Sequence, residues 1–202
     1  VRGDGVILFK DYPQGNKLII NKMGLSTSEW TNALKMSTNN NDVRSNRRNT
    51  SNSILCRHCR EYETLSYVLG KCSKGELLRT HRHHRVCDAI AGSLNKMGWI
   101  TYREDVNTNT NGDVRISDIV CINNTRSSGL IIDPTIRWEK NINQDIDVNT
   151  EKRNHYLDTI PNYKQRFPNI KSWDVVGLLF GARGTIPNFT IKYKLSQNIE
   201  DS

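Results

Sequence analysis

The chain has 202 residues, which is long enough to bury one sizeable core beside a small additional module. Lysine and arginine number 29 against 21 acidic residues, and the net charge of +8 favours a polyanion such as nucleic acid over a cationic partner. No apolar run reaches the roughly 18 to 20 residues of a membrane helix, and no signal peptide is recognisable, so we expect a soluble protein of a reducing compartment. Because the chain lacks an initiator methionine, it is expected to be part of a longer protein.

The N-terminal part predicts little independent structure. Lys17–Asn21 has the composition of a short strand, and Ser26 with Glu29 three residues later forms a capping box that predicts the start of a helix. From Ser37 to Ser53 the sequence is polar, which is typical of a linker. This linker is basic, and two interpretations stay open: a solvated loop or a segment that contacts phosphates. Its arginines are Arg44, Arg47 and Arg48.

The cysteines favour a metal site over disulfides. Cys56, Cys59 and Cys72 fall close together and begin with a Cys-x-x-Cys pair, whereas Cys87 and Cys121 stand in apolar surroundings. This distribution is a poor disulfide framework and is typical of a small zinc-binding module.

The remainder of the chain predicts a layered domain with one sheet. The predicted segments are a helix over Leu77–Lys96 with Gly98 as its C-cap, strands over Trp99–Glu104, Arg115–Cys121 and Leu130–Ile136, a helix over Glu151–Gln165 interrupted at Pro161, and a strand over Val175–Phe180. This order of helix, strands, helix and strand points to an α/β or α+β domain.

Two acids interrupt the apolar strands. Asp118 and Asp133 each stand in the middle of a β-rich run, where burial of a lone carboxylate would be costly. If the strands pair so that both acids share a face, their oxygens can hold Mg²⁺ together with water and a phosphate. Lys152 on the following helix can supply a cation, and Tyr156 lies one helical turn farther on. The alternative is that the acids lie at strand edges and that Lys152 is a surface residue.

Four further groups of residues occur in the same order as the motifs of a known protein family. They are Cys56-Arg57-His58-Cys59 with Glu63-Thr64-Leu65 and Cys72; Arg79, Arg82 and His83; Gly98-Trp99 and Glu104; and Gly181-Ala182-Arg183-Gly184-Thr185-Ile186. Together with the two acids and Lys152, these strings resemble the C-terminal region of site-specific non-LTR retrotransposon polyproteins. That region carries a zinc knuckle and a restriction-like endonuclease of the PD-(D/E)XK class.

The resemblance implies an α/β fold in which a restriction-endonuclease-like mixed sheet is flanked by helices. It divides the chain into a polymerase remnant with a basic linker (1–53), a degenerate zinc knuckle (54–76) and the endonuclease (77–195). It implies that Asp118 and Asp133 hold Mg²⁺ or Mn²⁺, that Lys152 positions or activates water, and that Glu104 and Tyr156 assist. The expected reaction is nicking of chromosomal DNA, which supplies the primer for reverse transcription by a domain that this chain lacks.

The sequence departs from the family at three positions. Ser117 replaces the proline before the first acid, and Thr135 stands where many nucleases of this class have lysine, so that Lys152 must supply the cation. Tyr67 replaces the histidine of the knuckle, and a phenol is a poor zinc ligand. His58 or His81 could substitute, or zinc binding could be weakened or lost.

The expected partner is double-stranded DNA, with the RNA of the element as a second nucleic acid, and a small-molecule ligand is not expected. Contacts with the DNA backbone are assigned to Arg79, Arg82, His83 and the linker arginines. A nuclear location is implied by the resemblance alone. Two rival interpretations remain: a decayed nucleic-acid-binding module that no longer cuts, and a zinc-dependent structural adaptor.

Overall fold

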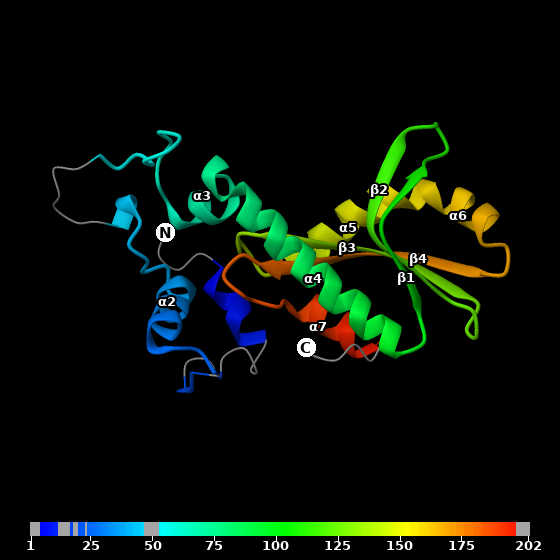
Figure 1. Ribbon diagram of the computed structural model, residues 1–202, viewed down its shortest axis with the longest axis horizontal. Coiled ribbons are helices and arrows are strands. Elements are labelled where there is room, and N and C mark those ends of the chain that lie inside the picture. The colour runs from blue at the N-terminus through cyan, green and yellow to red at the C-terminus, as the bar shows by residue number, and fades with distance from the viewer. Residues whose placement is uncertain (1–4, 12–16, 18–19, 23, 47–52, 197–202) are drawn as a thin grey trace. The chain divides into compact units, whose positions relative to one another are not determined.

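The computed structural model describes residues 5–11, 17, 20–22, 24–46 and 53–196, and they include helices and a single four-stranded sheet (Figure 1). In chain order the elements are η1 (Val6–Asp11), α2 (Thr27–Ser37), η2 (Arg44–Asn46), α3 (Leu65–Gly70), η3 (Ser73–Gly75), α4 (Glu76–Lys96), β1 (Ile100–Thr108), β2 (Val114–Asn123), β3 (Ser128–Arg137), α5 (Gln144–Tyr156), η4 (Leu157–Thr159), α6 (Ile160–Arg166), β4 (Ser172–Gly181) and α7 (Asn188–Ser196).

The chain folds as two compact units. The first comprises the described residues of Val1–Arg82, Ile136–Gln144 and Phe180–Asn188, and the second those of His83–Thr135, Asp145–Leu179 and Phe189–Ser202. The last two residues of β3 and of β4, with the segments that follow them, therefore belong to the first unit together with the N-terminal part. None of the helices in the described part of the chain combines the length and the apolar composition of a membrane span.

The N-terminal expectations have mixed outcomes. The helix after the capping box is confirmed as α2: Ser26 Oγ accepts from the backbone N–H of Glu29, and the Glu29 carboxylate accepts from the N–H of Ser26 at 2.9 Å. The strand expected over Lys17–Asn21 is wrong, because Lys17 and Ile20 have helical backbone. Arg47 and Arg48 lie outside the described residues.

The sheet has the order β1-β2-β3-β4 and is mixed. β1 pairs with β2 and β2 with β3 in antiparallel fashion. β4 runs parallel to β3, because Ser127 at the start of β3 accepts from Lys171 N just before β4, and Arg137 at its end accepts from Ala182 N just after β4. The α/β class with helices around a mixed sheet is thereby confirmed, and all four expected strands are present with longer bounds.

Helices cover both faces of this sheet. Tyr102 of β1 packs with Val120, Tyr163 and other members of a buried cluster to which α5 and α6 contribute. Its neighbour Arg103 pairs instead with Asp88 of α4. Adjacent residues of a strand point to opposite faces, so α4 lies on one face and α6 on the other.

The expected helix over Glu151–Gln165 is longer and is broken. α5 already begins at Gln144, and a 3₁₀ turn separates it from α6, which has Pro161 in its first turn. Proline is tolerated in that position because the N–H groups there have no partner within the helix. The break at Pro161 was expected, whereas the early start of α5 and the whole of α7 were not.

The glycine-rich string at residues 181–186 supports a buried ion pair in the first unit. Arg183 Nε lies 3.0 Å from Glu139 Oε2, and both side chains are fully buried. Thr185 Oγ1 donates to Glu139, and the Arg183 guanidinium stacks over Trp138 at 4.4 Å from the ring centre. A Cβ at Gly181 would collide with this carboxylate, so the glycine is required for the packing.

Candidate active site and metal centre

Asp118 and Asp133 each lie one residue beyond the last paired residues of β2 and β3. That last pair is Ile119 with Ile132, and one further step in the same antiparallel register would set Asp118 opposite Asp133. Residues directly opposite each other in antiparallel strands have Cβ atoms about 4.5–5.5 Å apart. Continuation of the register would therefore place the backbones of the two acids next to each other, while their side chains have different partners.

Asp133 is buried and paired. Its side chain is 6% exposed, Lys152 Nζ lies 3.0 Å from Oδ2, and Thr135 Oγ1 donates to Oδ1 at 2.9 Å. A carboxylate offers about four lone-pair positions, so these two contacts leave room for a cation. Lys152 provides the charge compensation that a buried carboxylate needs. Asp133 and Lys152, which the sequence analysis selected, are thus in contact. Thr135, which stands in place of a lysine, orients the Asp133 carboxylate.

Gly177 of β4 permits the approach of Lys152. A Cβ at this glycine would lie 2.7 Å from Lys152 Cβ and 2.8 Å from its Cγ. Any larger residue would therefore push α5 or the lysine stem away from the sheet. Gly177 is consequently a positioning residue of the site, and sequence analysis did not identify it as one.

Tyr156 lies beside the two acids as a neutral hydrogen-bond donor. Its hydroxyl donates to the backbone carbonyl of Ile116 in β2 at 2.8 Å. Burial raises the pKa of Tyr156 well above its usual range, and the charges of Asp133 and Asp118 raise it further. A phenol in this state fixes the strand and the local polarity and does not act as a base at neutral pH.

Glu104 lies at a distortion of β1. Its φ is +49°, and it is unpaired in the β1–β2 ladder, whereas its neighbours Arg103 and Asp105 pair with Ile119 and Ser117. As a result Tyr102 and Asp105, three residues apart, both contact Tyr163 on the same face of the sheet. The Glu104 carboxylate is instead turned to His84 of α4 at 3.2 Å and is 61% exposed. It does not share the Asp133–Lys152 contact, and its assisting role stays a prediction.

Asp118 also turns toward α4. His83 Nε2 lies 3.2 Å from Asp118 Oδ1, and the Cys87 sulfur lies 3.5 Å from the same nitrogen. The hydrogen bond to Asp118 raises the pKa of His83 to about 10, with a smaller contribution from Cys87. The sequence assigned His83 to DNA; in the structure it contacts a carboxylate, and its contact with DNA stays a prediction.

The other arginines assigned to DNA have contacts within the first unit. Arg79 donates to the carbonyl of Cys72 at 2.7 Å, and Arg82 donates to those of Ala182 and Leu69. Arg44 donates to the carbonyl of Leu55 at 2.6 Å. These side chains therefore support the fold around the cysteines, and contact with DNA stays a prediction for them.

Three cysteines form a cluster that could hold a metal ion. The sulfur of Cys72 lies 3.9 Å from that of Cys56 and 3.7 Å from that of Cys59. A tetrahedral Zn²⁺ with bonds of about 2.3 Å to sulfur has sulfur–sulfur edges of about 3.8 Å. Two of the three sulfur–sulfur distances thus match zinc coordination, and the third is within 4.8 Å.

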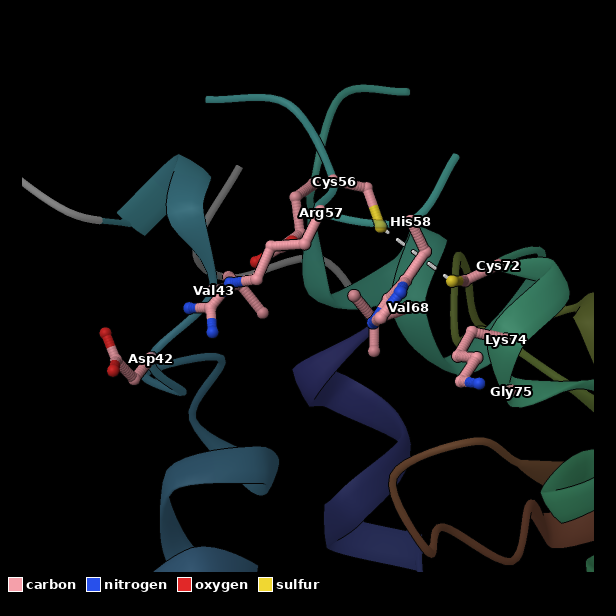
Figure 2. A pocket seen from close by; sticks show the side chains of 10 residues that line it. Asp42, Val43, Cys56, Arg57, His58, Val68, Cys72, Lys74 and Gly75 are labelled. Atoms are coloured by element: carbon pink, nitrogen blue, oxygen red, sulfur yellow. Dashed lines mark hydrogen bonds between the residues drawn. The ribbon is translucent and has the colours of Figure 1, made fainter. Parts of the chain in front are cut away.

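Tyr67 contacts one of the three sulfurs of this cluster. Its hydroxyl lies 2.6 Å from the Cys59 sulfur, and this hydrogen bond lowers the pKa of Cys59 and raises that of Tyr67. Among the described residues, neither His58 nor His81 joins the three sulfurs. His58 lines an adjacent cavity of about 370 Å³, into which Figure 2 shows the Cys56 and Cys72 side chains converging.

Sequence reasoning missed Cys87, which it treated as an apolar core residue. The signal that could have identified it is its spacing from His83: residues four apart on a helix lie on the same face. The sequence indicates that the Asp118 carboxylate needs a partner, because it stands in an apolar strand. Nothing in the sequence indicates that this side chain turns toward α4.

Comparisons with known proteins found no matching family model and no matching curated protein. Assignment to a family therefore depends on the residues and geometry described above.

Proposed function

We propose that this chain is the endonuclease part of a non-LTR retrotransposon polyprotein and cuts double-stranded DNA with the aid of Mg²⁺ or Mn²⁺. The observation that carries the proposal is the contact of Lys152 with Asp133, beside Asp118 in the neighbouring strand. Two carboxylates on neighbouring strands, one of them in contact with an ammonium group, are suited to phosphodiester hydrolysis.

The donor set fits a hard divalent cation. Asp118 and Asp133 would hold it through carboxylate oxygens, the ligands that Mg²⁺ prefers, with water and a phosphate oxygen completing the shell. The bound ion would supply a Lewis acid and a coordinated water of lowered pKa. Lys152 neutralises the Asp133 carboxylate and can hold the attacking water or the charge that develops on the phosphate.

The element order supports a restriction-like fold for the catalytic part. A helix, three antiparallel strands, a second helical segment and a parallel strand follow one another, as the resemblance implies. Both acids lie on strands and the lysine on the following helix, so that the site rests on regular elements and not on loops.

The net charge of +8 supports nucleic acid as the substrate class. Binding to a DNA backbone releases counterions and should weaken steeply as salt rises. Chromosomal DNA as the target implies nuclear action, and the RNA of the element is a second partner.

We further propose that Cys56, Cys59 and Cys72 bind Zn²⁺ as a knuckle beside the nuclease. Three thiolates at the observed spacing supply most of the coordination, with the fourth position left to water or to the Tyr67 oxygen. Because the fourth ligand is weak, we expect lower affinity than in a knuckle with four strong ligands.

Nicking of supercoiled plasmid by the purified chain tests the proposal. We expect relaxed circles with Mg²⁺, none with EDTA, and none from Asp133→Ala. The rival function, a decayed module that only binds nucleic acid, predicts an unchanged gel shift for Asp133→Ala and no nicking in any lane. Plasmid nicking that survives EDTA would contradict both functions.

A further inference from the structure

We propose that His83, Cys87 and Asp118 form a second transition-metal site, distinct from the three-cysteine cluster, that takes Zn²⁺. Because this site uses Asp118, Zn²⁺ bound there would compete with Mg²⁺ for the same carboxylate. Only this competition rests on the proposed function; metal binding by the three residues does not.

The distances match zinc coordination. His83 Nε2 lies 3.2 Å from Asp118 Oδ1 and 3.5 Å from Cys87 Sγ, and all three ligand atoms lie within 4.8 Å of one another. Tetrahedral Zn²⁺ with ordinary bond lengths has edges of about 3.4 Å between nitrogen and oxygen and about 3.6 Å between nitrogen and sulfur. Two of the three edges are therefore already formed.

The ligand types select against magnesium. Imidazole nitrogen and thiolate sulfur are ligands of Zn²⁺ and similar transition metals, whereas Mg²⁺ takes oxygen ligands almost alone. Three protein ligands with a fourth position for water is the composition of an open zinc site. Cys87 is fully buried, while the side chains of His83 and Asp118 are 30% and 24% exposed, so an ion can enter from their side.

The ligands are held by rigid elements. His83 and Cys87 lie one turn apart on α4, well inside the helix. Arg103 Nε donates to the backbone carbonyl of Asp118 at 3.0 Å, and the guanidinium also pairs with Asp88 of α4. These contacts fix β2 against the helix, which lowers the cost of assembling the site.

Zinc content after equilibrium dialysis provides the first test. We expect Cys87→Ser to lose one equivalent of Zn²⁺ relative to the wild-type chain, whatever the three-cysteine cluster holds. Cys121→Ser is the matched control, since Cys121 is also buried in the second unit but belongs to neither cluster, and it should lose none. Unchanged zinc content in Cys87→Ser would overturn the proposal.

A second variant covers the case in which Cys87→Ser fails to fold. Asp118→Asn changes a partly exposed ligand and should weaken binding of the second Zn²⁺ by about tenfold or more. With Co²⁺ as the probe, the wild-type chain should show a second, weaker thiolate charge-transfer band, and its absence would also overturn the proposal.

Nicking assays separate the site from the proposed function. At constant Mg²⁺, Zn²⁺ should inhibit wild-type nicking at concentrations about tenfold lower than those that inhibit Cys87→Ser. If the chain does not nick at all, the nuclease proposal fails while the zinc contents still decide the metal site. Equal inhibition of the two proteins would refute the competition.

Discussion

Gly177 lies directly beneath the stem of Lys152, where a single added methyl group would come within 2.7 Å of Lys152 Cβ. The backbone of β4 therefore sets how close the lysine comes to Asp133. This contact links a residue with no chemistry of its own to the geometry of the candidate active site.

We predict that Gly177→Ala lowers the nicking rate about a hundredfold, because displacement of a catalytic group by about 1 Å has effects of this size. Overpacking should also cost about 1–3 kcal/mol in the free energy of unfolding. Plasmid nicking and urea denaturation measure the two effects.

The matched control is Gly92→Ala in α4, where a Cβ meets nothing within 4 Å. It should leave nicking unchanged and stabilise the helix by up to about 1 kcal/mol. Normal nicking by Gly177→Ala would contradict this role.

Lys152→Met should destabilise the fold by about 2–4 kcal/mol, since it leaves the buried Asp133 without its cation. The neighbouring Arg153→Met removes a more exposed pair with Asp174 and should cost about 1 kcal/mol or less. Urea denaturation compares the two variants. Combining Lys152→Met with Asp133→Asn should recover part of the loss, and a purely additive double variant would argue against the coupling.

The His83–Asp118 pair predicts a pH dependence of stability. The folded-state pKa of His83 is raised to about 10 against a usual value of 6.5, so its contribution is fully present below pH 6.5 and is lost as pH rises toward 10. Stability measured in EDTA should therefore fall across this window. In Asp118→Asn the fall should be much smaller. An identical decline in both proteins would show that other groups cause it.

Tyr67→His should tighten zinc binding by the knuckle, because imidazole replaces a phenol beside three thiolates. Competition with a chromogenic chelator measures the affinity. Tyr67→Phe is the control, since it removes the hydroxyl without adding a ligand, and it should bind Zn²⁺ no more tightly than the wild-type chain. Equal affinities for the histidine and phenylalanine variants would show that position 67 does not face the metal.

The sheet, α4 and the Asp133–Lys152 pair could be predicted from the sequence because they follow local rules. Apolar residues repeat at helical or strand spacing, and an acid in a buried strand requires a cation. The start of α5 at Gln144 was missed because the first turns of this helix are mostly polar. No regular spacing of apolar residues therefore marks where it begins. The helical backbone at Lys17 and Ile20 was missed because short apolar runs suit either structure.

The partners of Asp118 and Glu104 could not be predicted, because no local pattern in the sequence indicates which way the two side chains turn. Glu104 has a positive φ that interrupts the alternation of β1, and both acids contact histidines of α4. The burial of Glu139 could not be predicted either, since a glutamate after a strand is usually solvated. Its partner Arg183 also lies far along the chain.

Nicking by Asp133→Asn and by Asp174→Asn tests the proposed active site most directly. Both replace an acid of the same sheet that pairs with a cation from α5, but Asp174 pairs with Arg153 and not with Lys152 and is half exposed. We predict that Asp133→Asn loses about a hundredfold or more of the Mg²⁺-dependent rate, while Asp174→Asn keeps the wild-type rate. Equal rates for the two variants would contradict the assignment of Asp133 to the active site.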